Sequence, residues 1–255
     1  MRAILSVAAT TFRESIRNRT VLGILILALG FIVSALLLAE LSLDQRLRVI
    51  TDWGLFCVSI FAVILAVLIG VSLVHKEVRR KTLYAVLSRP IHRWQYVVGK
   101  YLGLALTLLV EVGTMSVSLI LLLWISGQPP GALLIMALLA ILAEILLVAA
   151  LAVFFASFAS PYLSGLFTLG LFVVGRSLEA LGTLADKVEN TAVHGFLKGL
   201  FFVLPDFADY NLSTRVVHEI PIGPGELGWL WLYGIGYMGL LLFFGAWIFT
   251  RRDLV

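Results

Sequence analysis

Two apolar runs, 54–74 and 101–125, carry one charged residue between them and flank a short segment that is dense in cations. A bilayer has a hydrocarbon core of about 30 Å, which a helix crosses with about 20 apolar residues. Four further runs of similar character lie at 21–39, 132–158, 162–181 and 228–249. The sequence therefore predicts an all-α membrane protein with six transmembrane helices.

The composition excludes an ordinary soluble domain. The chain is 61% hydrophobic and 13% charged, whereas soluble domains contain about 25% charged residues. Its net charge of +4 comes from cations beside the apolar runs, where anionic lipid headgroups account for them. We therefore expect the lipid bilayer, and not a nucleic acid, as the partner of these charges.

The distribution of Lys and Arg predicts the orientation. With the N-terminus inside, thirteen of the 19 cations fall on the cytosolic side: Arg2, Arg13, Arg17, Arg19, the seven of the 75–100 hairpin, Arg251 and Arg252. Five fall outside, namely Arg46, Arg48, Lys187, Lys198 and Arg215, and Arg176 lies within a span. Because cytosolic loops are enriched in cations, both termini are expected to be cytosolic.

The first 20 residues predict an amphipathic helix that precedes a transmembrane domain at 21–255. Apolar residues recur at helical spacing on one side, at Leu5, Ala8, Ala9, Phe12 and Ile16. Basic residues opposite such a stripe are typical of a helix in the plane of the membrane surface. A disordered basic tail is the alternative.

One long segment, 182–227, is expected on the outer side. Its first half places apolar residues at helical spacing and predicts an amphipathic helix on the membrane's outer face. Its second half, 206–226, is rich in turn residues. That second half is expected to be too polar to insert.

The basic hairpin at 75–100 carries the main functional signal. Its centre, 82–88, has helical propensity and an apolar face formed by Leu83, Val86 and Leu87, and Pro90 ends it. Flanking cations make this short helix a docking surface for a soluble partner. The alternative is a helix on the membrane surface whose cations meet lipid headgroups.

Two carboxyl groups, Glu111 and Glu144, are predicted near the middle of the membrane on consecutive helices. Ionisable groups at that depth are costly and usually face the bundle interior or a water-filled path. They are either polar points on a substrate route or protonated carboxyls bonded to a neighbouring helix.

The sequence contains no G-x-x-x-x-G-K-[ST], no G-x-S-x-G and no H-E-x-x-H. The four histidines never pair at the spacing of metal ligands. We therefore expect no catalytic residue, no metal site and no cofactor in this chain.

At the hairpin the chain resembles the permease subunits of ABC-2 type exporters. The resemblance covers essentially the whole chain and includes the closing segment 249–254. In the hairpin it implies coupling to an ATPase by the following residues: Glu77, Arg79, Thr82, Leu83, Leu87, Arg89, Pro90 and Arg93. The family commonly has Gly before this Thr, where the chain has Lys81. The outer 204–207 also looks similar to permeases that mature nitrous-oxide reductase.

The resemblance implies a type V exporter-like fold, with an elbow helix at 1–20 and six spans in a bacterial inner membrane. Two copies of a separate ATPase, which bind ATP and magnesium, would serve a permease homodimer. A protein at the outer face could contact 182–227. The expected function is ATP-driven export. The alternatives are a secondary transporter that uses Glu111 and Glu144, and a membrane-embedded enzyme or scaffold of an assembly complex.

Overall fold

The computed structural model describes residues 2–42, 45–80, 93–127, 130–178, 182 and 204–251, which form helices joined by turns. The helices are α1 (Arg2–Ile16), α2 (Arg19–Glu40), α3 (Arg46–Arg80), α5 (Arg93–Ile125), α6 (Ala132–Ala156), α7 (Pro161–Arg176), α10 (Ser213–Val217) and α11 (Pro224–Arg251).

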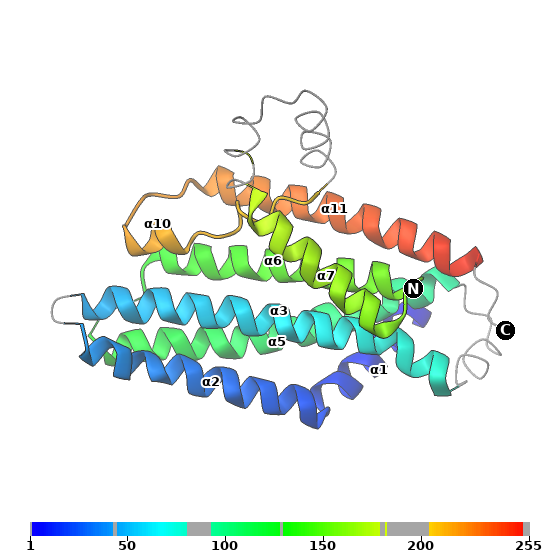
Figure 1. Ribbon diagram of the computed structural model, residues 1–255, viewed down its shortest axis with the longest axis horizontal. Helices are drawn as coiled ribbons and strands as arrows, with labels where there is room; N and C mark the ends of the chain where they lie inside the picture. Colours follow the sequence, from blue (N-terminus) through cyan, green and yellow to red (C-terminus); the bar gives the residue numbers. More distant parts are fainter. Residues whose placement is uncertain are drawn as a thin grey trace.

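The long helices α2, α3, α5, α6 and α11 run side by side along the long axis of the molecule (Figure 1). We call the end where α3 finishes and α5 starts the hairpin end, and the opposite end the α10 end. These five helices are long and apolar enough to cross a membrane, as predicted from their apolar runs. The fifth predicted span, 162–181, corresponds to α7, which has 16 residues and is not among the five. A count of six spans stays a prediction.

Two helices begin earlier than their apolar runs. Helix α3 starts at Arg46 and α5 at Arg93, each eight residues before the predicted span. Hydropathy reports the part of a helix that hydrocarbon surrounds, whereas backbone hydrogen bonding continues through the polar turns beyond it. The extra turns give α3 and α5 lengths of 35 and 33 residues.

Helix α6 lies at the centre of the bundle together with α3. It packs against α3, α5, α7 and α11, and 16 of its 25 residues are buried. A helix that is apolar on all sides has no preferred outward face and is stable inside a bundle. Large apolar side chains instead lie exposed on α2, α5, α7 and α11, for example Leu27, Leu109, Leu166 and Phe243. This surface suits contact with lipid tails.

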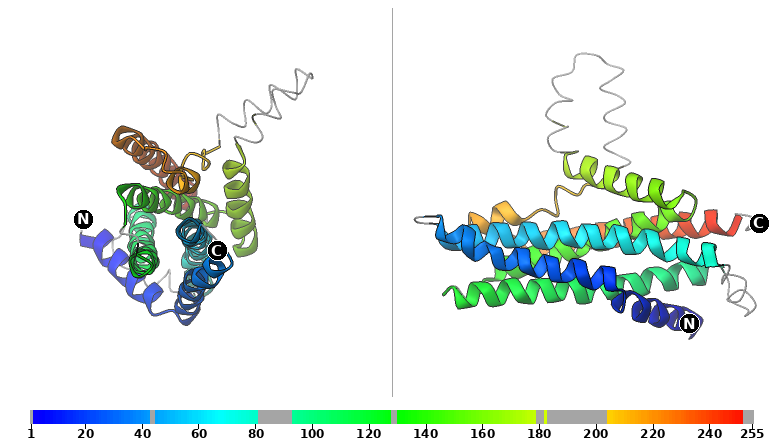
Figure 2. Two further views of the ribbon diagram at one scale, coloured as in Figure 1. Left: turned by 90° about the vertical axis from the view of Figure 1, so that its left-hand side faces the viewer. Right: turned by 60° about the horizontal axis from the view of Figure 1, so that its bottom comes forward.

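Helix α1 slants across the hairpin-end half of the bundle, on the side opposite α7 (Figure 2), and packs mainly on α5. The predicted helix is therefore present. Its packing face is made of small residues, since Ala8, Thr11 and Ser15 are buried, while Leu5 of the predicted apolar stripe is 66% exposed. Small side chains let α1 approach α5 closely and leave its bulky apolar residues to the surroundings. Its position in the membrane plane stays a prediction.

Two glycines on α5 make that approach possible. A Cβ atom at Gly103 would lie 2.6 Å from the Ala8 carbonyl oxygen and from the Thr11 Cβ. A Cβ atom at Gly99 would lie 2.9 Å from the Val7 Cβ. The spacing G-x-x-x-G is typical of helices that meet in membranes. Helix α1 is thus held tightly against the start of α5.

Replacing Gly103 should detach α1 from α5. We expect Gly103→Val to lower the free energy of unfolding by about 1–3 kcal/mol, because the new side chain overpacks the contact. Thermal unfolding of the detergent-purified protein measures this. The matched control is Gly113→Val on the same helix, where nothing lies within 4 Å. Equal melting temperatures for the two variants would contradict the close contact.

Candidate functional site

Helix α7 ends at Arg176, whose side chain reaches the buried interior of the bundle. It begins at Pro161, after the N-cap residue Ser160, as the Ser-Pro turn predicts. Its buried face carries Ser164 and Thr168, whose hydroxyls donate to carbonyls one turn earlier in the chain. Arg176 follows 15 residues after Pro161, which corresponds to about 22 Å of helix.

At this point Arg176 forms an ion pair with Glu144 of α6. Its Nη1 donates to Glu144 Oε1 and also to the Ser59 hydroxyl of α3, at 3.3 Å. Glu144 is fully buried, whereas the Arg176 side chain is 26% exposed. The guanidinium lies 5.7 Å from the centre of the Phe172 ring. One carboxylate oxygen, Oε2, has no hydrogen-bond partner among the described residues.

The loop 204–212 lies beside the end of α7, at the level of Gly175 and Arg176 in the bundle. Phe207 N donates to the Gly175 carbonyl at 3.2 Å, and a Cβ atom at Gly175 would lie 2.6 Å from the Pro205 carbonyl oxygen. Phe207 and Tyr210 are both fully buried. The Tyr210 hydroxyl donates to the Leu230 carbonyl of α11 at 2.9 Å. The loop is therefore part of the core.

The burial of this loop inside the bundle was not predicted from the sequence. That the second half of 182–227 is too polar to insert into the membrane stays a prediction. The turn signals are real, since the Asp206 carboxylate accepts from Ala208 N at 2.9 Å. The turns place Phe207, Tyr210 and Leu212 toward the bundle, and side-chain or backbone partners satisfy the polar groups. The predicted amphipathic helix in the first half lies in 183–203, outside the described residues.

A cavity of about 300 Å³ lies beside the ion pair, between α3, α6 and the end of the loop. Polar and apolar groups share its wall. The lining residues are Asp52, Trp53, Leu55, Phe56, Ser59, Ala137, Ile141, Arg176, Asn211, Leu212 and Ser213. Hydrogen-bonding groups that converge on a mostly apolar hollow are typical of small-molecule sites. We call it the Arg176 cavity.

Glu111 is the second predicted polar point, and the structure buries it as well. It is 2% exposed, and neither carboxylate oxygen has a hydrogen-bond partner among the described residues. It faces the bundle between two contacts of α5 with α3, Leu104 near Gly70 and Leu119 against Gly54. Glu111 and Glu144 are therefore both central, but no hydrogen bond joins them.

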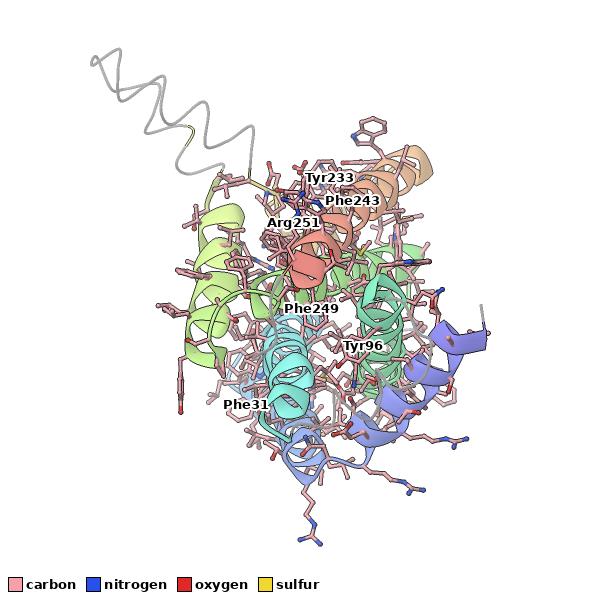
Figure 3. The ribbon with its side chains drawn as sticks, turned by 90° about the vertical axis from the view of Figure 1, so that its right-hand side faces the viewer. Phe31, Tyr96, Tyr233, Phe243, Phe249 and Arg251 are labelled. Carbon is pink, nitrogen blue, oxygen red and sulfur yellow. The ribbon has the colours of Figure 1, made fainter. Side chains whose placement is uncertain are left out.

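At the hairpin end, α5 and α11 meet through aromatic rings. Tyr96 and Phe249 stack with centroids 5.9 Å apart and an interplanar angle of 16° (Figure 3). Lys100, only 4% exposed, lies 5.6 Å from the centre of the Tyr96 ring. The start of α5 is thus fixed between α1 and α11.

The predicted coupling residues lie next to this fixed end. Glu77 and Arg79 belong to the last turns of α3, and Arg93 begins α5. Thr82, Leu83, Leu87, Arg89 and Pro90 fall in 81–92, outside the described residues. The coupling role therefore stays a proposal.

The sequence interpretation missed the pairing of Arg176 with Glu144, although a signal for it exists. Glu144 lies 12 residues before the end of α6 at Ala156, and Arg176 lies 15 residues after the start of α7 at Pro161. Opposite charges about 18 and 22 Å along two helices from one tight turn come within reach of each other when the helices pack. Asp52 and Ser59 carry no comparable signal, because single polar residues near a helix start are common.

The bundle of long apolar helices is that of a polytopic membrane protein. The model of the family described as "ABC-2 family transporter protein" matches residues 5–198, about three quarters of the chain. The chain belongs to this family and is a permease subunit of an ABC transporter. No curated protein matches the chain by sequence.

Breaking the Arg176–Glu144 pair should destabilise the protein strongly. We expect Glu144→Gln to lower the free energy of unfolding by about 3–5 kcal/mol, because it leaves a guanidinium uncompensated inside the bundle. Replacing both partners, as in Glu144→Gln with Arg176→Met, should recover much of this loss. Thermal unfolding of the purified variants measures both effects.

The exposed pair Glu40–Arg46 supplies the control, since Glu40→Gln should cost less than about 1 kcal/mol. If Glu144→Gln lowers the free energy of unfolding as little as Glu40→Gln does, the buried pair does not hold α7 in place.

Proposed function

We propose that this chain is the membrane subunit of an ATP-driven exporter and that a separate ATPase docks on the 75–100 hairpin. Membership of the ABC-2 family carries the proposal. The hairpin joins α3 and α5, the two longest helices. A movement imposed on the hairpin is therefore applied to two rigid elements that extend through the whole bundle.

The packing at the hairpin end supports this coupling. Gly99 and Gly103 hold α1 on α5, and Tyr96 stacks on Phe249 of α11. The start of α5 therefore moves together with two other helices. Leu83, Val86 and Leu87 supply the apolar face for the ATPase, and the nearby cations, Arg79 and Arg89 among them, supply charge complementarity around it.

The ATPase binds ATP and magnesium, and two copies serve two permease chains. Helix α2 supports a homodimer, because its exposed face carries Gly23 and Gly30, seven residues apart, with nothing within 4 Å of either. Small residues on an exposed transmembrane face let a second helix approach closely. ATP-driven closure of the ATPase pair would rock the two bundles and alternate access to a central route.

Glu111 and Glu144 mark that route in the middle of each bundle. Their incomplete hydrogen bonding supports this role, because three of their four carboxylate oxygens have no partner among the described residues. Such groups are costly unless a substrate or water reaches them. Family membership favours an ATP-driven mechanism over a secondary transporter or an assembly scaffold.

The cation distribution supports a topology with the hairpin and both termini in the cytosol and the α10 end outside. The membrane we propose is a bacterial inner membrane. A groove of about 1010 Å³ at the α10 end has Arg48 and Glu219 on its wall and Val216 and Val217 beside them. We place the contact of an outer-face protein there. The Leu204–Phe207 loop extends the similarity to permeases that mature nitrous-oxide reductase.

Changing Leu87 to Asp should abolish docking of the ATPase. The substitution buries an unpaired carboxylate at the contact, which is strongly unfavourable. Co-purification of the ATPase from membranes that co-express both subunits should fall at least about tenfold, while the amount of inserted permease stays the same. Ile220→Asp at the α10 end, where Ile220 is 46% exposed, is the control. Undiminished co-purification with Leu87→Asp would remove the hairpin from the ATPase contact.

A further inference from the structure

Arg176 has donor groups left over after it binds Glu144. Both of its hydrogen bonds use Nη1, to Glu144 Oε1 and to Ser59 Oγ. Its Nε and Nη2 groups have no partner among the described residues, and a quarter of the side chain is exposed on the cavity wall. A guanidinium offers five N–H donors in a planar fork that matches a carboxylate or a phosphate.

A negatively charged side chain, Asp52, lies on the cavity wall away from Arg176. Asp52 is exposed and has no ion-pair partner among the described residues. It lies on α3 seven residues before Ser59, so the two are on one helix face and about 10 Å apart along the axis. The wall between them is apolar, formed by Leu55, Phe56 and Ile141. The Arg176 cavity thus has a cationic end in mid-bundle and an anionic end toward α10.

We propose that the Arg176 cavity binds a small zwitterion, with its anionic group on the free Arg176 donors and its ammonium group toward Asp52. Hydrogen bonds to ionised groups are about twice as strong as neutral ones, so the two ends fix the orientation of the ligand. The cavity volume of about 300 Å³ limits the ligand to a small molecule with a short apolar middle. The proposal rests on the proposed transport function, because it names the substrate class of the route beside Glu144.

Three probes with the same six-carbon chain test how much the anionic group and the ammonium group each contribute to binding. They are 6-aminohexanoate, which is a zwitterion, hexanoate, which is an anion, and hexylamine, which is a cation. Isothermal titration of the purified full chain in nanodiscs measures each affinity. We expect 6-aminohexanoate to bind at least about tenfold more tightly than either singly charged probe, which corresponds to about one additional charge-assisted hydrogen bond.

Two conservative variants then test which end of the cavity binds each charged group of the ligand. Arg176→Lys keeps the positive charge beside Glu144 but loses the planar fork, and should weaken 6-aminohexanoate at least about tenfold. Asp52→Asn should reduce the affinity for 6-aminohexanoate to the affinity that the wild-type protein has for hexanoate. Glu40→Gln, an acid at the α10 end that pairs with Arg46, should change nothing.

Equal binding of the three probes, binding of none of them, or unchanged affinity in Arg176→Lys would each overturn the proposal. These titrations contain no ATPase. If 6-aminohexanoate binds as expected but no ATPase co-purifies with the permease, the transport function alone is contradicted. If the ATPase co-purifies but 6-aminohexanoate does not bind, the zwitterion site alone is contradicted.

Discussion

The buried ion pair between Arg176 and Glu144 is the interaction on which the rest of the site depends. A single charge in the middle of an apolar bundle is unfavourable by several kcal/mol, and two opposite charges in contact remove most of that penalty. The pair joins the end of α7 to the middle of α6. The loop that carries Phe207 and Tyr210 packs at the same level of the bundle, where Phe207 N donates to the Gly175 carbonyl.

The same arrangement links the cavity to the hairpin end. Helix α3 contributes Asp52 and Ser59 to the cavity and continues without interruption to Arg80 beside the hairpin. Helix α6 contributes Glu144 and packs on α3 along its length. Rigid helices transmit a displacement from one end to the other, because a packed core has few intermediate arrangements. A hairpin moved by a partner would therefore change the wall of the Arg176 cavity.

The sequence predicted the parts of the fold that hydrophobic length determines. The spans at 21–39 and 132–158 fall within a few residues of α2 and α6, because membrane thickness fixes how long an apolar helix must be. Glu111 and Glu144 were predicted near the middle of the membrane, facing the bundle interior or a water-filled path, and the structure buries both side chains.

Features that depend on contacts between distant residues were not predictable in this way. The packing face of α1 consists of small residues opposite Gly99 and Gly103, which a hydrophobic stripe does not identify. The buried loop reads as polar because Asp206 and Asp209 lie beside Phe207 and Tyr210. Its turns point some of these side chains into the bundle and others away from it. The composition of the segment does not distinguish the two groups. The part of the predicted coupling surface that falls in 81–92 lies outside the described residues.

In the proposed coupling, ATP bound by a partner at the hairpin end changes the cavity near the opposite end. The most direct measurement is the rate at which an impermeant thiol reagent, added from outside to right-side-out vesicles of the permease–ATPase complex, labels Ser213→Cys on the cavity wall. Ile220→Cys is the control, and Cys57 is replaced by Ala in both. We expect ATP with vanadate to change the labelling rate of Ser213→Cys and to leave that of Ile220→Cys unchanged. The same rate for Ser213→Cys with and without nucleotide, or no labelling from outside, would contradict the proposed coupling.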